Sequence, residues 1–156
     1  MHLPFYERIW LVFAAAILVL FVSVVSVGAV MTARALPGHA ETVDPERVLQ
    51  EDPRFSRPRM EQVSPGVYEA YVVARMFSFA PQEIRVPSGS RVTFLITSPD
   101  VIHGFEIART NVNVMVMPGY VTRVTARFKD PGEYLILCNE YCGLGHQVMS
   151  ARLIVE

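Results

Sequence analysis

Side chains that bind soft metal ions are concentrated near the end of this 156-residue chain. The segment EYLILCNEYCGLGHQVM contains Cys138, Cys142, His146 and Met149. Two thiolates, an imidazole and a thioether are nitrogen and sulfur donors, which suit copper rather than magnesium or calcium. Another histidine, His103, lies far upstream in SPDVIHGFEI, at the end of a strand-like run. The sequence therefore predicts a soft metal site in this segment, with His103 as a candidate contributor.

The two cysteines leave several kinds of site open. A mononuclear blue-copper site uses one cysteine, two histidines and a weak axial donor, so two thiolates are more than it needs. Two neighbouring sulfurs can instead bridge two metal ions. Alternatively, Cys138 and Cys142 could form a disulfide outside the cytosol, and His146 and Met149 would then be ordinary loop and core residues.

The elements that position these residues begin with a long apolar segment. Residues 9–31 (IWLVFAAAILVLFVSVVSVGAVM) carry no charge, and they slightly exceed the roughly 20 apolar residues that a helix needs to cross a bilayer. Ala33-Arg34-Ala35 resembles a signal-peptide cleavage site, but the apolar run is longer than the usual h-region of about 7–15 residues. We therefore expect an uncleaved transmembrane helix over residues 9–33, preceded by an N-terminal segment of residues 1–8.

Residues 34–62 are predicted to connect this helix to a globular domain. The segment is rich in charge, and its regular structure should be interrupted by Pro45, Pro53 and Pro58. A short helical turn is expected at Pro45–Gln50, with Asp44 as its capping residue. His39 has no second donor near it in the sequence and is expected to be a surface residue rather than a ligand.

From Val67 the pattern changes to short runs with apolar residues at every second position. These runs are VYEAYVVAR, IRV, RVTFLITS, HGFEIA, NVNVMVM, VTRVTARF, YLILC and MSARLIV. In RVTFLITS, for example, Val92, Phe94 and Ile96 share one face. About eight strands with turn signals between them indicate an all-β Greek-key sandwich or barrel over residues 63–156. Such a scaffold can hold loop residues from distant segments together at one rim.

The composition excludes some partners. The formal net charge is −1, so there is no basic stripe to neutralise the phosphates of a nucleic acid. Hydrophobic residues make up 51% of the chain, which is high for a soluble domain and places part of it in the lipid bilayer. Two cysteines are too few for a small disulfide-stabilised scaffold.

The spacing C-x-E-x-C-x-x-x-H-x-x-M resembles the binuclear copper (CuA) loop of subunit II of haem-copper cytochrome c oxidases. The resemblance extends through SPDVIHGFEI, PGEY and CGLGHQ, and more loosely to the N-terminal helix. The chain looks most like the short, single-helix subunit II of the B-type oxidases. This resemblance implies a cupredoxin-like Greek-key β-domain with one N-terminal transmembrane helix.

The resemblance also implies a set of ligands for two copper ions. Cys138 and Cys142 would bridge the ions, His103 and Met149 would bind one of them, and the other would be bound by His146 and the main-chain carbonyl of Glu140. We expect the rim around the site to be enclosed by Val101, Ile102, Leu144 and Val148. Two further methionines are expected to fill the core or line the rim, namely Met115 and Met117.

Three more residues have roles that the resemblance suggests. Phe77 in RMFSF matches the position where B-type proteins expose an apolar contact for cytochrome c; a core phenylalanine is the alternative, since Phe77 and Phe79 share one face of a strand. Glu7 matches a glutamate near the mouth of the proton-uptake path in B-type oxidases, although the sequence alone favours an exposed partner of Arg8 at the membrane surface. The Glu140 carboxylate could help to bind magnesium at the contact with subunit I, as in A-type oxidases.

The predicted function is that of subunit II of a terminal cytochrome c oxidase. It would accept electrons from cytochrome c, or from an equivalent cupredoxin donor, and pass them to haem in subunit I, where oxygen is reduced and protons are translocated. The chain would be a single-pass protein of the cell membrane with its copper domain on the outer face.

Three alternatives are weighed against this function. A membrane-anchored copper storage or delivery protein would favour exposed ligands, whereas Gly143 and Gly145 tighten an enclosed loop. Quinol oxidase subunits of the same fold have usually lost the copper ligands, which this chain keeps. Nitrous oxide reductase attaches the copper loop to a much larger catalytic domain.

Overall fold

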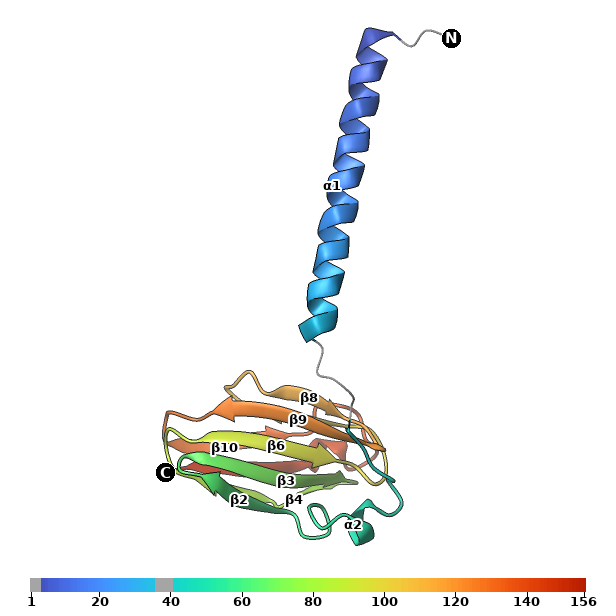
Figure 1. Ribbon diagram of the computed structural model, residues 1–156. Helices are drawn as coiled ribbons and strands as arrows, with labels where there is room; N and C mark the ends of the chain where they lie inside the picture. Colours follow the sequence, from blue (N-terminus) through green and yellow to red (C-terminus); the bar gives the residue numbers. More distant parts are fainter. Residues whose placement is uncertain (1–3, 36–40) are drawn as a thin grey trace. The chain divides into compact units, whose positions relative to one another are not determined.

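A computed structural model describes residues 4–35 and 41–156. The chain divides into two compact units, Met1–His39 and Ala40–Glu156. In the first unit a single helix, α1, spans Phe5–Ala35 (Figure 1). His39, expected to be a surface residue, lies outside the described residues.

Helix α1 is long and apolar enough to cross a membrane. The segment Phe5–Met31 contains an 18-residue stretch with a mean hydropathy of 2.8. At about 1.5 Å per residue it measures about 40 Å, compared with about 30 Å for the hydrocarbon core of a bilayer. The helix begins earlier than predicted, because Glu7, expected to precede it, lies in its first turn.

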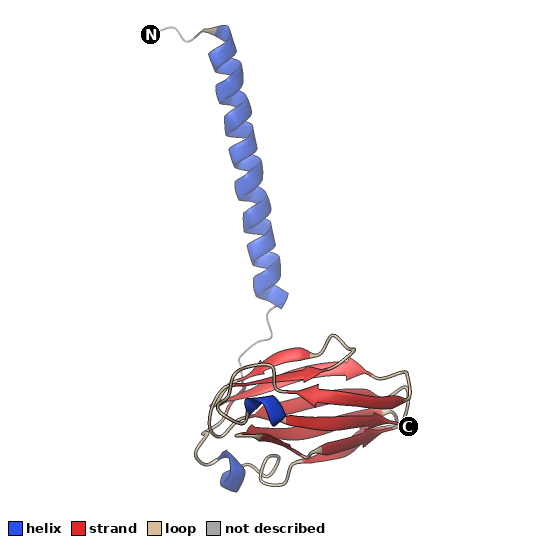
Figure 2. Ribbon diagram, turned by 180° about the vertical axis from the view of Figure 1, so that it is seen from behind, coloured by secondary structure: helices blue, strands red, loops and turns tan. Residues whose placement is uncertain are grey.

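The second unit is a sandwich of two β-sheets, which Figures 1 and 2 show from opposite sides. The first sheet has the order β1-β9-β6-β3-β2, with β4 paired to β3. Its strands are β1 (Glu41–Thr42), β2 (Arg59–Ser64), β3 (Val67–Arg75), β4 (Ser78–Ala80), β6 (Arg91–Thr97) and β9 (Tyr120–Arg127). The second sheet has the order β5-β11-β10-β7-β8. Its strands are β5 (Glu83–Val86), β7 (His103–Ile107), β8 (Asn113–Val116), β10 (Gly132–Leu137) and β11 (Ser150–Val155).

The crossovers of this topology follow the Greek-key pattern. Strands β3 and β6 pair in parallel, as do β5 and β11, whereas the other neighbours are antiparallel. Strands β6 and β10 end at the edge of the sandwich where β7 begins. The segments that follow β6 and β10 therefore meet the start of β7 at one rim. This rim carries the predicted metal-binding residues.

The main core lies between the two sheets. As the alternation predicts, Val92, Phe94 and Ile96 of β6 are fully buried there. Aromatic rings connect the layers: the centroids of Phe94 and Phe105 are 5.4 Å apart, and those of Phe79 and Phe105 are 5.6 Å apart in an edge-to-face arrangement. Such pairs add specific geometry to the apolar burial that stabilises the sandwich.

A second buried cluster lies on the other face of the first sheet. Val48 of the short helix α2 (Val48–Glu51) and Phe55 pack there against Leu95 and its neighbours. The structure therefore differs from the predicted connector over residues 34–62, since its described part from residue 41 onward belongs to the same compact unit as the sandwich. The strands β1 and β2 also lie in this segment, and the alternation did not reveal them.

Hydrogen bonds and ion pairs fix the segment around α2. The backbone carbonyl of Asp44 accepts hydrogen bonds from the amides of Arg47 and Val48, so the helical turn exists, but α2 starts three residues later than predicted. Arg54 donates to both oxygens of Asp52, at 3.0 and 2.7 Å, and pairs with Glu41. These hydrogen bonds from Arg54 outweigh burial and lower the pKa of the Asp52 carboxyl from its ordinary value.

The predicted strands from residue 67 onward all appear, with ends that differ by a few residues. Strand β4 and the 3₁₀ turn His146–Val148 are additional. Met115 and Met117, which were expected to fill the core or line the rim, are 47% and 39% exposed because Val114 and Val116 take the inward positions near β8. The expectation that they belong to the core is wrong.

Candidate metal centre

Two strand pairings bring the predicted ligands together. Strand β10 ends one residue before Cys138, and β11 begins one residue after Met149. The pairing of β10 with β11 therefore closes the loop between them. The amide of Cys138 donates to the carbonyl of Met149 at 3.3 Å at the base of this loop. Because β7 runs antiparallel to β10, its first residue, His103, lies at the same rim.

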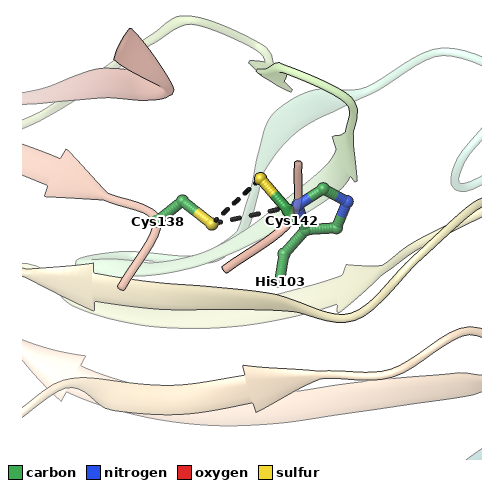
Figure 3. A group of neighbouring side chains, drawn as sticks. All are labelled: His103, Cys138 and Cys142. Atoms are coloured by element: carbon green, nitrogen blue, oxygen red, sulfur yellow. Dashed lines mark hydrogen bonds between the residues drawn. The ribbon is translucent and has the colours of Figure 1, made fainter. Parts of the chain in front are cut away.

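The donor atoms of these residues form one connected cluster. The Sγ atoms of Cys138 and Cys142 lie 3.8 Å apart, and Nδ1 of His103 is 3.9 Å from Cys138 Sγ (Figure 3). On the other side, Cys142 Sγ lies 3.7 Å from Nδ1 of His146 and 3.7 Å from Sδ of Met149. Nitrogen and sulfur donors at these separations could hold metal ions between them.

Glu140 contributes a main-chain oxygen to the same cluster. Its carbonyl accepts a hydrogen bond from Cys138 Sγ at 3.2 Å. Its carboxylate belongs to an exposed residue. Among the described residues, one group of three or more histidine, cysteine and carboxylate side chains is close enough to share an ion, namely His103 with Cys138 and Cys142. The Glu140 carboxylate is not part of it.

Most of the cluster is buried. His103 is 0% exposed and Met149 2%, while Cys142 and Cys138 are 5% and 7% exposed. Burial, together with the hydrogen bond to Cys138, raises the pKa of the Cys142 thiol to about 11, so this sulfur carries a proton until a metal ion displaces it. Both cysteines are free, and their 3.8 Å separation is far longer than the roughly 2.05 Å of a disulfide bond.

Asp100 fixes the orientation of the His103 ring. Its Oδ1 accepts a hydrogen bond from Nε2 of His103 at 2.9 Å, which leaves Nδ1 directed toward Cys138. The amide of Met76 donates to Oδ2 at 2.8 Å, and that of Val101 donates to Oδ1 at 2.6 Å. Burial acts to raise the pKa of the Asp100 carboxyl, but these hydrogen bonds outweigh it and hold the pKa below its ordinary value. Sequence analysis missed this residue, although its place three positions before His103 is a usable signal.

Phe77 lies against the loop between Cys142 and His146. Its side chain is 37% exposed, whereas Phe79 is 1% exposed, so the two phenylalanines do not share a face. The expectation that they do is wrong because β3 ends at Arg75 and a turn precedes β4. The Phe77 ring takes the space where β-carbons at Gly143 and Gly145 would lie. Because it is exposed and belongs to neither buried cluster, it is not a core phenylalanine.

The rim around the cluster is less enclosed than predicted. Ile102, Leu144 and Val148 are 45%, 89% and 71% exposed, and only Val101 packs against the core. Their expected role in enclosing the metal site is wrong, because the loop carrying Leu144 and Val148 turns these side chains outward. Together with Tyr141, which is 76% exposed, Ile102, Leu144 and Val148 form an exposed apolar rim beside the buried donors.

The fold and the donor set define a class of protein. A two-sheet Greek-key sandwich with a histidine, cysteine and methionine cluster at one rim is a cupredoxin-like metal-binding domain. The family model described as cytochrome c oxidase subunit II, periplasmic domain, matches residues 69–156.

Comparison with individual known proteins indicates the same family. The cytochrome c oxidase subunit 2 of Thermus thermophilus is 46% identical over 155 residues, which cover 97% of this chain and 92% of the relative. A chain in the solved structure of a heme-copper terminal oxidase dimer is 34% identical with a TM-score of 0.61, covering 97% of this chain and 99% of that one. The periplasmic domain of subunit II of the cytochrome oxidase of Bradyrhizobium japonicum has a TM-score of 0.53 at 18% identity, covering 56% and 83%, and supports the fold alone. This chain belongs to the cytochrome c oxidase subunit II family.

Proposed function

We propose that this chain is the electron-entry subunit of a cytochrome c oxidase. It accepts electrons from cytochrome c, or from an equivalent cupredoxin donor, and passes them to haem in subunit I, where oxygen is reduced to water and protons are translocated. The observation that carries this proposal is the pair of buried sulfurs 3.8 Å apart, each with an imidazole nitrogen within 3.9 Å.

The residues present fit a pair of copper ions. The ions would be held by the thiolates of Cys138 and Cys142, by His103, His146 and Met149, and by the carbonyl of Glu140. Bound there, the copper pair supplies one-electron redox chemistry. The donor set is soft, as copper requires, and its two sulfurs exceed what a mononuclear blue-copper site uses.

The protein's own residues keep this site rigid and mostly dry. The strand pairing of β10 with β11 fixes both ends of the loop, and burial of His103 and Met149 keeps water away from one side of the cluster. Asp100 holds the tautomer and orientation of His103. Because the donors are held before a metal binds, little rearrangement should accompany a change in charge.

The surroundings of the site fit docking of a donor. Phe77, which packs on the copper loop and is 37% exposed, is the proposed contact for the electron donor. The family and the helix α1 support a membrane-anchored subunit with its β-domain on the outer face, attached to subunit I. Glu7 stays a predicted proton-uptake residue, and magnesium binding by Glu140 would need ligands from subunit I.

Metal stoichiometry combined with electron paramagnetic resonance tests this function. The full chain in detergent should bind two coppers, with one unpaired electron spread over both. The Cys142→Ser variant should lose the delocalised signal. One copper per chain with hyperfine structure from a single nucleus would instead indicate a blue-copper-like site and refute the proposal.

A second assay separates electron transfer from copper storage or delivery. A storage protein should release copper quickly to a chelator, whereas a site whose His103, Cys138, Cys142 and Met149 are only 0–7% exposed should release it slowly. Rapid exchange, without oxidation of reduced cytochrome c by the copper-loaded chain, would favour the storage function.

A further inference from the structure

The two histidines of the metal cluster lie on different segments. His103 begins β7, whereas His146 lies in the 3₁₀ turn between β10 and β11. The turn Met76–Phe77, which follows β3, contacts a neighbour of each histidine. Met76 contacts Asp100, and Phe77 contacts the loop that carries His146. The cluster needs both imidazoles in place at once, so a segment that contacts both sides can set their relative position.

Asp100 connects this turn to His103. One carboxylate oxygen accepts the Nε2 proton of His103 at 2.9 Å, and the other accepts the amide proton of Met76 at 2.8 Å. Val101 and Ser98 also donate to Oδ1, at 2.6 and 3.0 Å, and so prevent the carboxylate from rotating. A displacement of the Met76 backbone must therefore move the His103 ring or break a hydrogen bond to a charged group, which is among the stronger kinds.

Phe77 connects the same turn to the loop that carries His146. A β-carbon at Gly145 would lie 2.5 Å from Cγ and Cδ2 of the ring, and one at Gly143 would lie 2.9 Å from Cε1. The ring thus rests directly on the loop backbone at both glycines. The amide of His146 donates to the carbonyl of Gly143 at 3.1 Å, so a shift of Gly143 is passed on to the histidine.

We propose that Asp100 and Phe77 form a single brace that positions His103 and His146 relative to each other. Both are positioning residues, since they act through the histidines and not on the metal. The brace exists in the protein without copper, and only its consequence for copper binding rests on the proposed function. Its physical value is preorganisation: a metal site whose supports are locked binds more tightly than one assembled on binding.

The apoprotein provides the first test, by NMR of the histidine rings of the full chain in detergent micelles. Asp100→Asn is the selective variant. An oxygen should stay at the Oδ1 position, where Val101 and His103 donate, so the amide replaces Oδ2 and cannot accept from Met76. We expect the ring resonances of His146 to shift although Asp100 does not contact it.

The reciprocal variant is Phe77→Leu, which removes the flat ring from the copper loop and should shift the resonances of His103. Val63→Ala, which shortens an exposed apolar side chain of β2, is the matched control and should shift neither histidine. If each variant shifts only the histidine on its own side, the two contacts are independent and the brace is overturned.

Copper binding provides the second test. Each single variant should weaken copper binding by about 10–100-fold, as is typical when a residue supporting a metal ligand is lost. Because both residues act on one brace, the double variant Asp100→Asn/Phe77→Leu should bind copper with about the same affinity as the single variant that has the lower affinity. If the loss of affinity in the double variant instead equals the product of the two single fold-losses, the brace is overturned. Failure of the unaltered chain to bind two coppers would refute the proposed function alone, since the NMR result does not depend on copper.

Discussion

Replacing Gly145 by alanine tests the packing of the copper loop against Phe77. The backbone of Gly145 has φ −97° and ψ 11°, which any residue can adopt, so the substitution adds a β-carbon without backbone strain. That carbon would lie 2.5 Å from two ring atoms of Phe77 and 3.1 Å from its Cβ. Alanine at this position can be accommodated only if the ring or the loop moves.

The required movement sets the magnitude. Ordinary contacts begin near 3.4 Å, so the ring and the loop must separate by about 0.9 Å. The neighbouring Met76 is held by Asp100, and the loop is closed by the pairing of β10 with β11, so neither side yields freely. Overpacking of this kind typically costs 1–3 kcal/mol. For a domain of this size a loss of 1 kcal/mol lowers the midpoint of thermal unfolding by about 4 °C, so the midpoint should fall by about 4–12 °C.

Thermal unfolding of the apoprotein, followed by circular dichroism, measures this effect in two backgrounds. In a Phe77→Ala background the space above Gly145 is open, so Gly145→Ala should cost less than about 0.5 kcal/mol. Gly145→Ala should lower copper affinity in the otherwise unaltered chain and change it little in the Phe77→Ala background. An equal loss of stability in both backgrounds, or no loss in either, would refute the packing described here.

Three further predictions concern the potential, the pH dependence and donor docking. Met149→Leu should retain two coppers and shift the redox potential, because the Met149 thioether would be one of the copper donors; loss of copper on titration would contradict this. Asp52→Asn should destabilise the domain by about 1.5 kcal/mol at pH 7. The pKa of Asp52 is lowered on folding, so its contribution to stability is complete above the ordinary value of 3.8 and disappears as the pH falls through the folded value. The free energies of unfolding of the two proteins, measured with denaturant, should therefore converge below that pH. A constant difference would contradict the ion pair with Arg54. The rate of electron transfer from reduced cytochrome c should change less than about threefold between low and physiological salt, and Leu144→Asp should slow it; a steep salt dependence would indicate a charged contact.

The strands were predictable where one face is buried and the other is not. In β5, Ile84 and Val86 alternate with the charged residues Glu83 and Arg85 and are buried, whereas the charged residues are exposed. The strands β1 and β4 could not be found in this way, because two or three residues are too few to show a period. The burial of Phe55 was also hidden, since the proline-rich segment around it has no regular pattern although it packs on the first sheet.

The clustering of the candidate donors could be anticipated because metal chemistry restricts residue type and spacing; that they bind copper stays a prediction. The surroundings could not be anticipated. Whether Leu144 faces inward or outward, and whether Phe77 shares a face with Phe79, depends on loop and turn conformations that no periodicity encodes. The same holds for Asp100, whose contact with Met76 joins residues 24 positions apart.

The sequence by itself determined the candidate donors of the loop from Cys138 to Met149, the apolar helix and the alternating strands, because each depends on residues that are close together along the chain. Only the tertiary structure decided that His103 meets Cys138 across 35 positions, that the described part of the proline-rich segment joins the domain, and that the rim is exposed. These features depend on strand pairing and on packing between distant segments. Such contacts form only when the whole sandwich is folded.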